Sequence, residues 1–259
     1  MDASMLAEFD RSRELPRLGG MARPDGVAIV SERFWAFAGV DGSLREGRMP
    51  KARRSLRRIP LLRGLVRLSL SLTPLVRRDG VARTRERLLL GLAVAAPFGF
   101  AFLPQRFSLA AGLALTACLI GWMLRGRTLS LHGAEHRAIA AVEERRLAAT
   151  WEGSARPTRF ASRCGTNFAA LALPISVAFE RFWPFAPTLY ASAAVVLLSL
   201  AVTMELWVAV EGSRRRLARA LLLPGLGLQR LTTREPSLAD TRIALRATES
   251  VLQREALAA

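Results

Sequence analysis

The two histidines of the chain, His132 and His136, lie four residues apart in the segment LHGAEHRAIAAVEE (131–144). In a helix this spacing puts both imidazoles on one stripe, about 6 Å apart along the axis, close enough to bind one metal ion. Glu135 completes an H-x-x-E-H pattern, in which two histidines hold zinc and the glutamate activates water. Histidines at this spacing also form ordinary hydrogen-bonded surface pairs. We favour a metal site because both histidines of the chain share one stripe.

Glu143 lies on the same stripe, but about 10 Å beyond His136 along the helix axis. It is therefore expected to orient a ligand, or to belong to another site, rather than to join the histidine pair. The H-x-x-E-H pattern alone would suggest a peptidase with a soluble α/β fold, which the long apolar stretches of this chain do not favour. We therefore expect the coordination chemistry without the peptidase identity.

A second candidate is the segment RCGTNF (163–168). Cys164 could be a thiolate ligand or a nucleophile, and Arg163 could bind an anion together with the free N–H groups of a helix start. A structural role is equally compatible, with Thr166 or Asn167 capping the following helix. Cys118 falls in an apolar stretch far from Cys164, so both cysteines are expected to be thiols.

Two further candidates lie nearer the C-terminus. Glu205 interrupts an apolar stretch, where a carboxylate could be a third metal ligand, a proton relay, or the partner of a polar group on a neighbouring helix. In QRLTTREP (229–236), Arg230 and Arg234 could hold a phosphate or lipid headgroups.

The apolar residues are concentrated in long stretches that predict a polytopic, mainly α membrane protein with four transmembrane helices arranged as two hairpins. A helical span needs about 20 apolar residues. The predicted spans are Leu88–Pro104, Phe107–Leu124, Asn167–Pro184 and Pro187–Glu211.

The net charge of +17 is placed in a way that favours a membrane over nucleic acid. With four spans, Arg106 and Arg181 are the only basic residues on one side, which predicts a multi-pass protein of the bacterial inner membrane with both termini in the cytoplasm. The basic side would attract anionic lipid headgroups. Nucleic acid is an unlikely partner, because no basic motif interleaved with aromatic residues is present.

The remaining organisation follows from composition. Alternating residues around the turn dipeptide Asp41–Gly42 predict a small β element with a hairpin over Gly26–Gly47. IPLLRGLVRLSLSL (59–72) predicts a basic amphipathic helix that lies on the membrane or packs on a neighbour. The predicted segments are a disordered N-terminus (1–18), a cytoplasmic hairpin plus amphipathic helix (19–87), a transmembrane hairpin (88–124), a cytoplasmic site segment (125–166), a second transmembrane hairpin (167–211) and a cytoplasmic C-terminal segment (212–259).

Several separated segments together resemble the YqhQ-like family, bacterial membrane proteins described as predicted metal-dependent enzymes. GGMARPDGVAIV (19–30) is similar to the family's GGQAVIEGVMM pattern, with Asp25 at its glutamate, and LHGAEHRAIAAVE (131–143) is similar to YHGAEHK with its downstream glutamate. RCGTNF and IPLLRGLVRLSLSL also resemble family segments, as does PGLGLQRLTTREP (224–236). The resemblance adds four candidate site residues, which are Gln229, Thr232, Thr233 and Glu235.

Two positions depart from the family pattern. Ala161 stands where the family has the histidine of HPRCGT, and Arg242 stands where a glutamate usually follows the C-terminal EP. If that histidine is a ligand, His132 and His136 need a third donor from Cys164 or an acidic residue.

These observations support two hypotheses. The first is a metal-dependent enzyme that carries out hydrolysis or group transfer on an amphiphilic or anionic substrate, with zinc or another divalent transition metal held by His132, His136 and Cys164, and with Glu135 as general base. The second is a non-enzymatic membrane scaffold or assembly factor that binds lipid headgroups, a protein partner or a second copy of itself. The missing family histidine favours the second.

Overall fold

The structure is a computed structural model that describes residues 3–12, 14–51, 56, 58–77, 80–100, 104–123, 125–185, 188–213 and 215–258. The chain divides into two compact units. The first comprises Met1–Lys51, Gly126–Leu171 and Val208–Ala259, and the second comprises Ala52–Arg125 and Ala172–Trp207.

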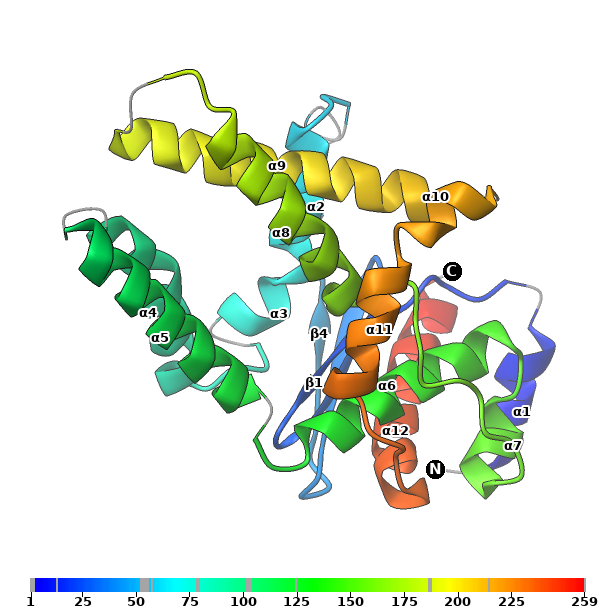
Figure 1. Ribbon diagram of the computed structural model, residues 1–259. Coiled ribbons are helices and arrows are strands. Elements are labelled where there is room, and N and C mark those ends of the chain that lie inside the picture. Colours follow the sequence, from blue (N-terminus) through cyan, green and yellow to red (C-terminus); the bar gives the residue numbers. More distant parts are fainter. Residues whose placement is uncertain are drawn as a thin grey trace. The chain divides into compact units, whose positions relative to one another are not determined.

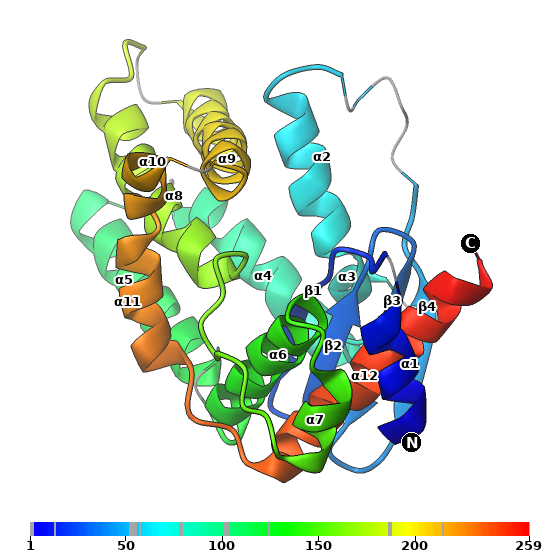
Figure 2. The same ribbon diagram turned by 90° about the vertical axis from the view of Figure 1, so that its right-hand side faces the viewer.

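The first unit is built on a four-stranded antiparallel sheet in which each strand pairs with the next along the chain (Figures 1 and 2). The strands are β1 (Gly19–Arg23), β2 (Gly26–Val30), β3 (Phe34–Gly39) and β4 (Leu44–Arg48). Asp41 and Gly42 lie in the turn between β3 and β4, where Gly42 adopts a φ of 85° that other residues avoid. Strand β1 extends the sheet beyond the predicted hairpin.

Helices of the first unit cover the sheet and each other, and α6 and α12 lie together against it (Figures 1 and 2). Helix α6 contacts β1 and β2, and α12 contacts β2 and β3. The described helices of this unit are α1 (Ala3–Arg11), α6 (Thr128–Glu143), α7 (Leu147–Glu152), α10 (Arg216–Ala220), α11 (Leu223–Thr232) and α12 (Leu238–Leu257).

The core of this unit lies between α6, α12 and one face of the sheet. Val27 and Ile29 point to this face because side chains alternate along a strand, and their partners on β3 are the small residues Ala38 and Ala36. Small side chains on both helices allow close approach to the sheet. The buried alanines of the helices are Ala134, Ala138, Ala141, Ala244 and Ala247.

The N-terminal segment was expected to be disordered, but Ala3–Arg11 forms α1. Leu6 is completely buried, and the Asp10 carboxylate accepts hydrogen bonds from the backbone N–H groups of Leu147 (2.9 Å) and Ala148 (3.1 Å) at the start of α7. This contact joins residues that are far apart in the chain, so local composition does not reveal it. Residues 1, 2 and 13 of the segment lie outside the described residues.

The second unit is helical among its described residues. Its helices are α2 (Leu62–Ser71), α3 (Thr73–Val76), α4 (Thr84–Phe100) and α5 (Gln105–Met123), together with most of α8 (Gly165–Arg181) and α9 (Leu189–Glu211), which begin or end in the first unit. Helices α4 and α5 form an antiparallel pair, and α8 contacts α9 through a hydrogen bond between the Ser176 and Ser199 hydroxyls (3.1 Å).

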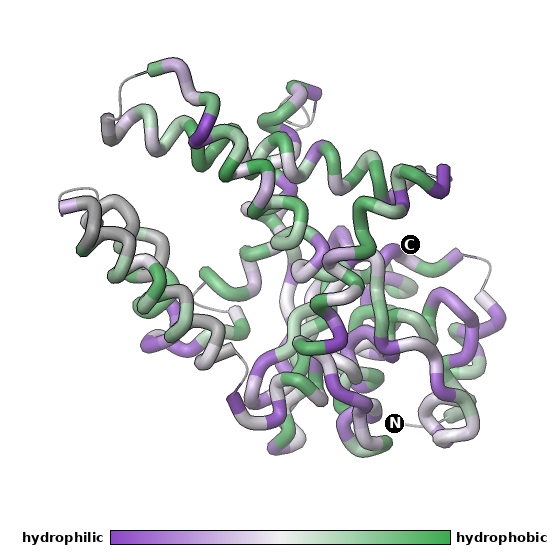
Figure 3. Tube along the Cα trace, in the orientation of Figure 1, coloured by the Kyte–Doolittle hydropathy of each residue, from purple (hydrophilic) through white to green (hydrophobic). Residues whose placement is uncertain are grey.

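The prediction of four transmembrane helices was wrong. Among the described residues, one helix is long and apolar enough to cross a membrane, Tyr190–Glu211 in α9, and apolar residues run along it in Figure 3. Helix α4 has 17 residues and begins with charged side chains, which leaves only Leu88–Phe100 apolar, and the 17-residue α8 contains Pro174 and ends at Arg181. Both are shorter than the roughly 20 apolar residues that a span needs.

Other expectations depended on those four spans. The multi-pass topology, and the assignment of both termini and the intervening segments to the cytoplasm, lose their basis with them. Residues 101–103, 124, 186 and 187 of the predicted hairpins, and the side chain of Arg106, lie outside the described residues.

Candidate metal centre

Helix α6 positions the two histidines and is buried along most of its length. Gly133, between them, faces the backbone of the segment that follows α11, and a Cβ atom there would overlap the Arg234 carbonyl oxygen. The Arg234 backbone N–H donates to the Leu129 carbonyl oxygen (2.9 Å). The absence of a side chain at Gly133 therefore lets the C-terminal segment cross α6 at the histidines.

Both histidines are fixed in the same tautomer by backbone carbonyl groups. The Nδ1 atom of His132 lies 2.8 Å from the Thr232 carbonyl oxygen, and that of His136 lies 2.7 Å from the Arg159 carbonyl oxygen. A carbonyl oxygen only accepts, so each Nδ1 carries the proton and each Nε2 keeps its lone pair. This is the arrangement by which metal-binding histidines are oriented in proteins.

Cys164 lies at the start of α8 with its thiol directed at α6. Its Sγ atom is 3.4 Å from His132 Nε2, and the backbone N–H of Thr166 donates to the same sulfur (3.3 Å). The residue is 6% exposed. Cysteine binds metals and acts as a nucleophile through its sulfur in the thiolate form.

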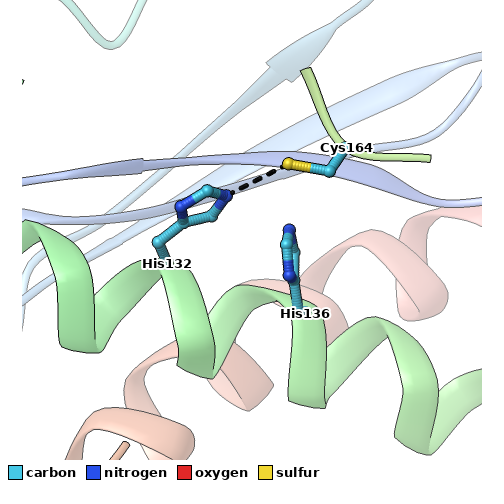
Figure 4. Close-up of side chains that lie close together, drawn as sticks. All are labelled: His132, His136 and Cys164. Carbon is cyan, nitrogen blue, oxygen red and sulfur yellow. Dashed lines mark hydrogen bonds between the residues drawn. The ribbon is translucent and has the colours of Figure 1, made fainter. Parts of the chain in front are cut away.

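The three side chains converge on one point (Figure 4). A ligand atom from each of His132, His136 and Cys164 lies within 4.8 Å of the others. The Nε2 atom of His136 is buried and has no hydrogen-bond partner among the described residues, although a buried polar atom normally has one. In tetrahedral zinc sites nitrogen and sulfur ligands lie about 2.0–2.3 Å from the ion. The donor types and their convergence fit such an ion, and three protein ligands leave a fourth position open, as in catalytic zinc sites.

Ala161, at the position of the family histidine, contributes its backbone instead of a side chain. Its N–H donates to Gln229 Oε1 (2.9 Å) and its carbonyl oxygen accepts from Gln229 Nε2 (2.7 Å). Gln229 is completely buried and also donates to Asn167 Oδ1 (3.3 Å). Gln229 thus pairs with the loop before Cys164 as a neighbouring strand would.

Asn167 also holds the loop before Cys164, although the sequence indicated it only as a possible helix cap. Its amide group donates to the carbonyl oxygens of Ala161 (2.9 Å) and Ser162 (2.8 Å). Gly225 of α11 packs directly on Asn167, because a Cβ atom at Gly225 would overlap its side-chain oxygen. In the sequence, the first glycine of PGLGLQ was the available signal of this close contact.

The two threonines of the C-terminal motif have different surroundings. The Thr232 hydroxyl lies 3.5 Å from the Thr166 hydroxyl, beside Cys164, while the Thr232 carbonyl orients His132. The Thr233 hydroxyl is buried and donates to the Gln229 carbonyl oxygen (2.7 Å). Thr233 therefore supports the end of α11.

Glu135 is buried against strand β1 and is not among the three converging side chains. A Cβ atom at Gly20 would lie 2.7 Å from Glu135 Cγ, so this glycine makes room for the carboxyl group. Burial raises the pKa of Glu135 to about 7, against the opposing effects of the electrostatic influence of His132 and a hydrogen bond with the Ala22 backbone. The role of Glu135 as general base stays a prediction.

Glu143 and Arg163 are ion-paired to each other, and Arg163 Nε also lies 3.1 Å from Glu211 Oε1. Glu143 thus lies away from the histidine pair, as the helical rise requires. The paired Arg163 connects the Cys164 loop to α6 and to the end of α9.

Glu235 interacts with two arginines that the sequence did not single out. Its carboxylate accepts from Arg137 Nη2 (2.5 Å) and lies 3.5 Å from Arg159 Nη1. Arg159 is the residue whose carbonyl oxygen orients His136. Glu235 therefore supports the backbone that orients the His136 imidazole.

Glu205 belongs to the second unit and forms a bidentate ion pair with Arg63 of α2, with Nε–Oε1 and Nη2–Oε2 distances of 2.8 and 2.5 Å. It also accepts from the Leu61 backbone N–H (3.2 Å). Gly64 permits this docking, since a Cβ atom there would lie 2.9 Å from Met204 Cβ. Of the alternatives for Glu205, the structure shows the polar pairing with a neighbouring helix.

Comparison with known proteins supports the resemblance to the YqhQ-like family. A family model described as "Protein of unknown function (DUF1385)" matches residues 115–254. The chain is 29% identical over 135 residues to "Uncharacterized protein YqhQ" of Bacillus subtilis (strain 168), which covers 51% of this chain and 42% of that protein. The chain thus spans less than half the length of this relative. No solved structure matches the chain.

Proposed function

We propose that this chain, which belongs to the DUF1385 family, is a metal-dependent enzyme whose ion, zinc or another divalent transition metal, is held by His132, His136 and Cys164. The supporting observation is the convergence of two Nε2 atoms and one sulfur, together with the buried Nε2 of His136, which has no hydrogen-bond partner in the described part of the chain. Nitrogen and sulfur donors favour zinc over magnesium or calcium. A zinc ion at this site supplies Lewis-acid chemistry for hydrolysis or group transfer.

The surrounding residues have separate tasks in this proposal. Glu135 is the proton acceptor, since it is the carboxyl group buried next to His132 on α6 and interacts electrostatically with that histidine. The carbonyl groups of Thr232 and Arg159 hold the imidazoles. Gln229 holds the loop that presents Cys164.

The proposed substrate is amphiphilic or anionic, because basic residues outnumber acidic ones by 38 to 21.

Elemental analysis of the purified protein tests the metal centre. Wild-type protein purified without chelators is expected to carry near-stoichiometric zinc, and His136→Ala is expected to lose it because the variant lacks one of the three donors. Cys164→Ser should weaken zinc retention. Glu143→Gln is the matched control, since Glu143 shares the stripe of α6 but lies outside the cluster, and it should keep its zinc. Equal metal content in wild type and His136→Ala, or none in either, would refute the proposal.

We also propose that the second unit associates with the bacterial inner membrane. Large apolar side chains are exposed on several of its helices, and contiguous exposed apolar surface marks membrane or protein contacts. They include Leu88, Leu92, Leu113, Leu173, Val177, Tyr190 and Leu197. The exposed Arg67 of α2 is available to anionic headgroups.

Vesicle flotation tests this association. The protein is expected to float with vesicles that contain phosphatidylglycerol, and Arg67→Gln should reduce the bound fraction, because one basic residue near an anionic surface contributes about 1 kcal/mol. Vesicles of phosphatidylcholine alone should show no difference between wild type and variant. Protein that stays at the bottom of the gradient with both kinds of vesicle would contradict membrane association.

A membrane scaffold that binds a protein partner or a second copy of the chain is the second candidate. It is favoured by Ala161, whose position offers no side-chain donor to a metal. The two candidates differ in the zinc content that they predict. If the protein floats with vesicles but contains no metal, the scaffold replaces the enzyme as the proposed function.

A further inference from the structure

The first unit contains a polar cavity of about 210 Å³ between α6, α7 and the start of α12. Pockets for drug-sized ligands run to about 300–1,000 Å³, so this one suits a single small group. Its principal polar lining residues are Arg137, Arg156, Glu235 and Ser237.

Arg137 is a buried cation in the wall of this cavity, with 6% of its surface exposed. Its guanidinium donates to the carbonyl oxygens of Pro157 (3.1 Å) and Pro236 (3.5 Å) and to the Glu235 carboxylate (2.5 Å). A guanidinium has five N–H groups, so two remain for a further acceptor.

Two other features add positive potential. Arg156 lines the cavity, is exposed, and has no partner within the described part of the chain. Helix α12 starts at the cavity, where Ser237 is its N-cap and Leu238 a lining residue. The first N–H groups of a helix have no intrahelical acceptor and favour an anion. Asp240 in this first turn is already engaged by Arg127, Ser130 and Ser237.

Glu235 is the acidic side chain of the lining, and it has an alternative partner. It also contacts Arg159, whose Nε atom is buried and has no acceptor among the residues that the structure describes. When a ligand accepts hydrogen bonds from the free N–H groups of Arg137, Glu235 can therefore still pair with Arg159.

We propose that this cavity binds a phosphoryl group. Arginine N–H groups match phosphate oxygens in a bidentate manner, and the cavity supplies two arginines from different directions. The inference rests on the proposed function, because it names the anionic part of the substrate. The cavity and the candidate metal centre are linked through Arg159, which contacts Glu235 by its side chain and His136 by its carbonyl oxygen.

Calorimetric titration of the full-length protein with inorganic phosphate, and separately with a soluble short-chain phosphatidic acid, tests the proposal. Wild type is expected to bind, and Arg156→Gln should raise the Kd about tenfold through loss of a charged donor. Arg219→Gln is the matched control, because Arg219 is an exposed arginine of α10 outside the cavity lining, and it should bind as wild type does. Tighter binding of phosphatidic acid identifies a lipid headgroup as the source, and equal binding identifies free phosphate.

The same titration with His136→Ala separates this proposal from the metal centre. Binding that persists in this variant places the phosphoryl group in the cavity. Loss of binding in His136→Ala, an unchanged Kd in Arg156→Gln, or no binding of either probe to wild type would overturn the proposal. Zinc content measured on the same samples reports on the metal centre independently, since Arg156→Gln should keep its zinc.

Discussion

Gly133→Ala is expected to lower the free energy of unfolding by about 2–3 kcal/mol, the effect of forcing an added methyl group into a packed interior. The new Cβ would meet the Arg234 carbonyl oxygen, which belongs to the backbone and cannot rotate away. Separation of the two segments would break the Arg234–Leu129 backbone hydrogen bond and draw the Thr232 carbonyl away from His132. The variant should therefore lose zinc as well as stability.

Urea denaturation followed by circular dichroism measures the first effect, and elemental analysis the second. Gly227→Ala provides the matched control: Gly227 is also helical, but nothing lies within 4 Å of a Cβ placed there. Because alanine favours a helix over glycine by about 1 kcal/mol, this control should be neutral or slightly stabilised. Equal free energies of unfolding for Gly133→Ala and Gly227→Ala would contradict the close contact at Gly133.

Glu135→Gln is expected to stabilise the metal-free protein at pH 8 while leaving its stability at pH 4.5 nearly unchanged. The pKa of Glu135 is raised by burial from 4.5 to about 7 in the folded chain. Between these values the folded state holds a proton that the unfolded state has released, so wild-type stability falls as pH rises through this window and levels off above about pH 7. The shift corresponds to roughly 3 kcal/mol.

Unfolding free energies measured from pH 4.5 to 8, after chelator treatment, test this prediction. The difference between Glu135→Gln and wild type should grow over this range, while Glu152→Gln, which changes an exposed carboxylate on α7, should follow wild type throughout. A constant difference between Glu135→Gln and wild type would show that the pKa of Glu135 is the same in the folded and the unfolded chain.

Local sequence predicted several elements of this protein because the physics behind them is local. The Asp41–Gly42 dipeptide indicated the turn between β3 and β4, since glycine tolerates the positive φ found there. The helical repeat placed His132 and His136 on one stripe and kept Glu143 away from them. The amphipathic pattern indicated a helix where α2 lies.

The count of transmembrane helices failed for a physical reason. Apolar composition does not state where a helix begins and ends, and the helix ends decide whether an apolar stretch is long enough to span a bilayer. Helix α4 begins within charged residues, and α8 begins at Gly165 and is over by Arg181. Of the four predicted spans, α9 alone remains long and apolar enough among the described residues.

The sequence by itself determined the chemical types available to this site, which are two imidazoles on one helical stripe, a thiol and a nearby carboxyl group. Only the tertiary structure decided which of them meet. Cys164 reaches the histidines because Gln229 holds its loop across a separation of 68 residues, and the Thr232 carbonyl that fixes the tautomer of His132 comes from 100 residues away. Contacts between such distant segments depend on packing and backbone hydrogen bonds, and these leave no local periodicity in the sequence.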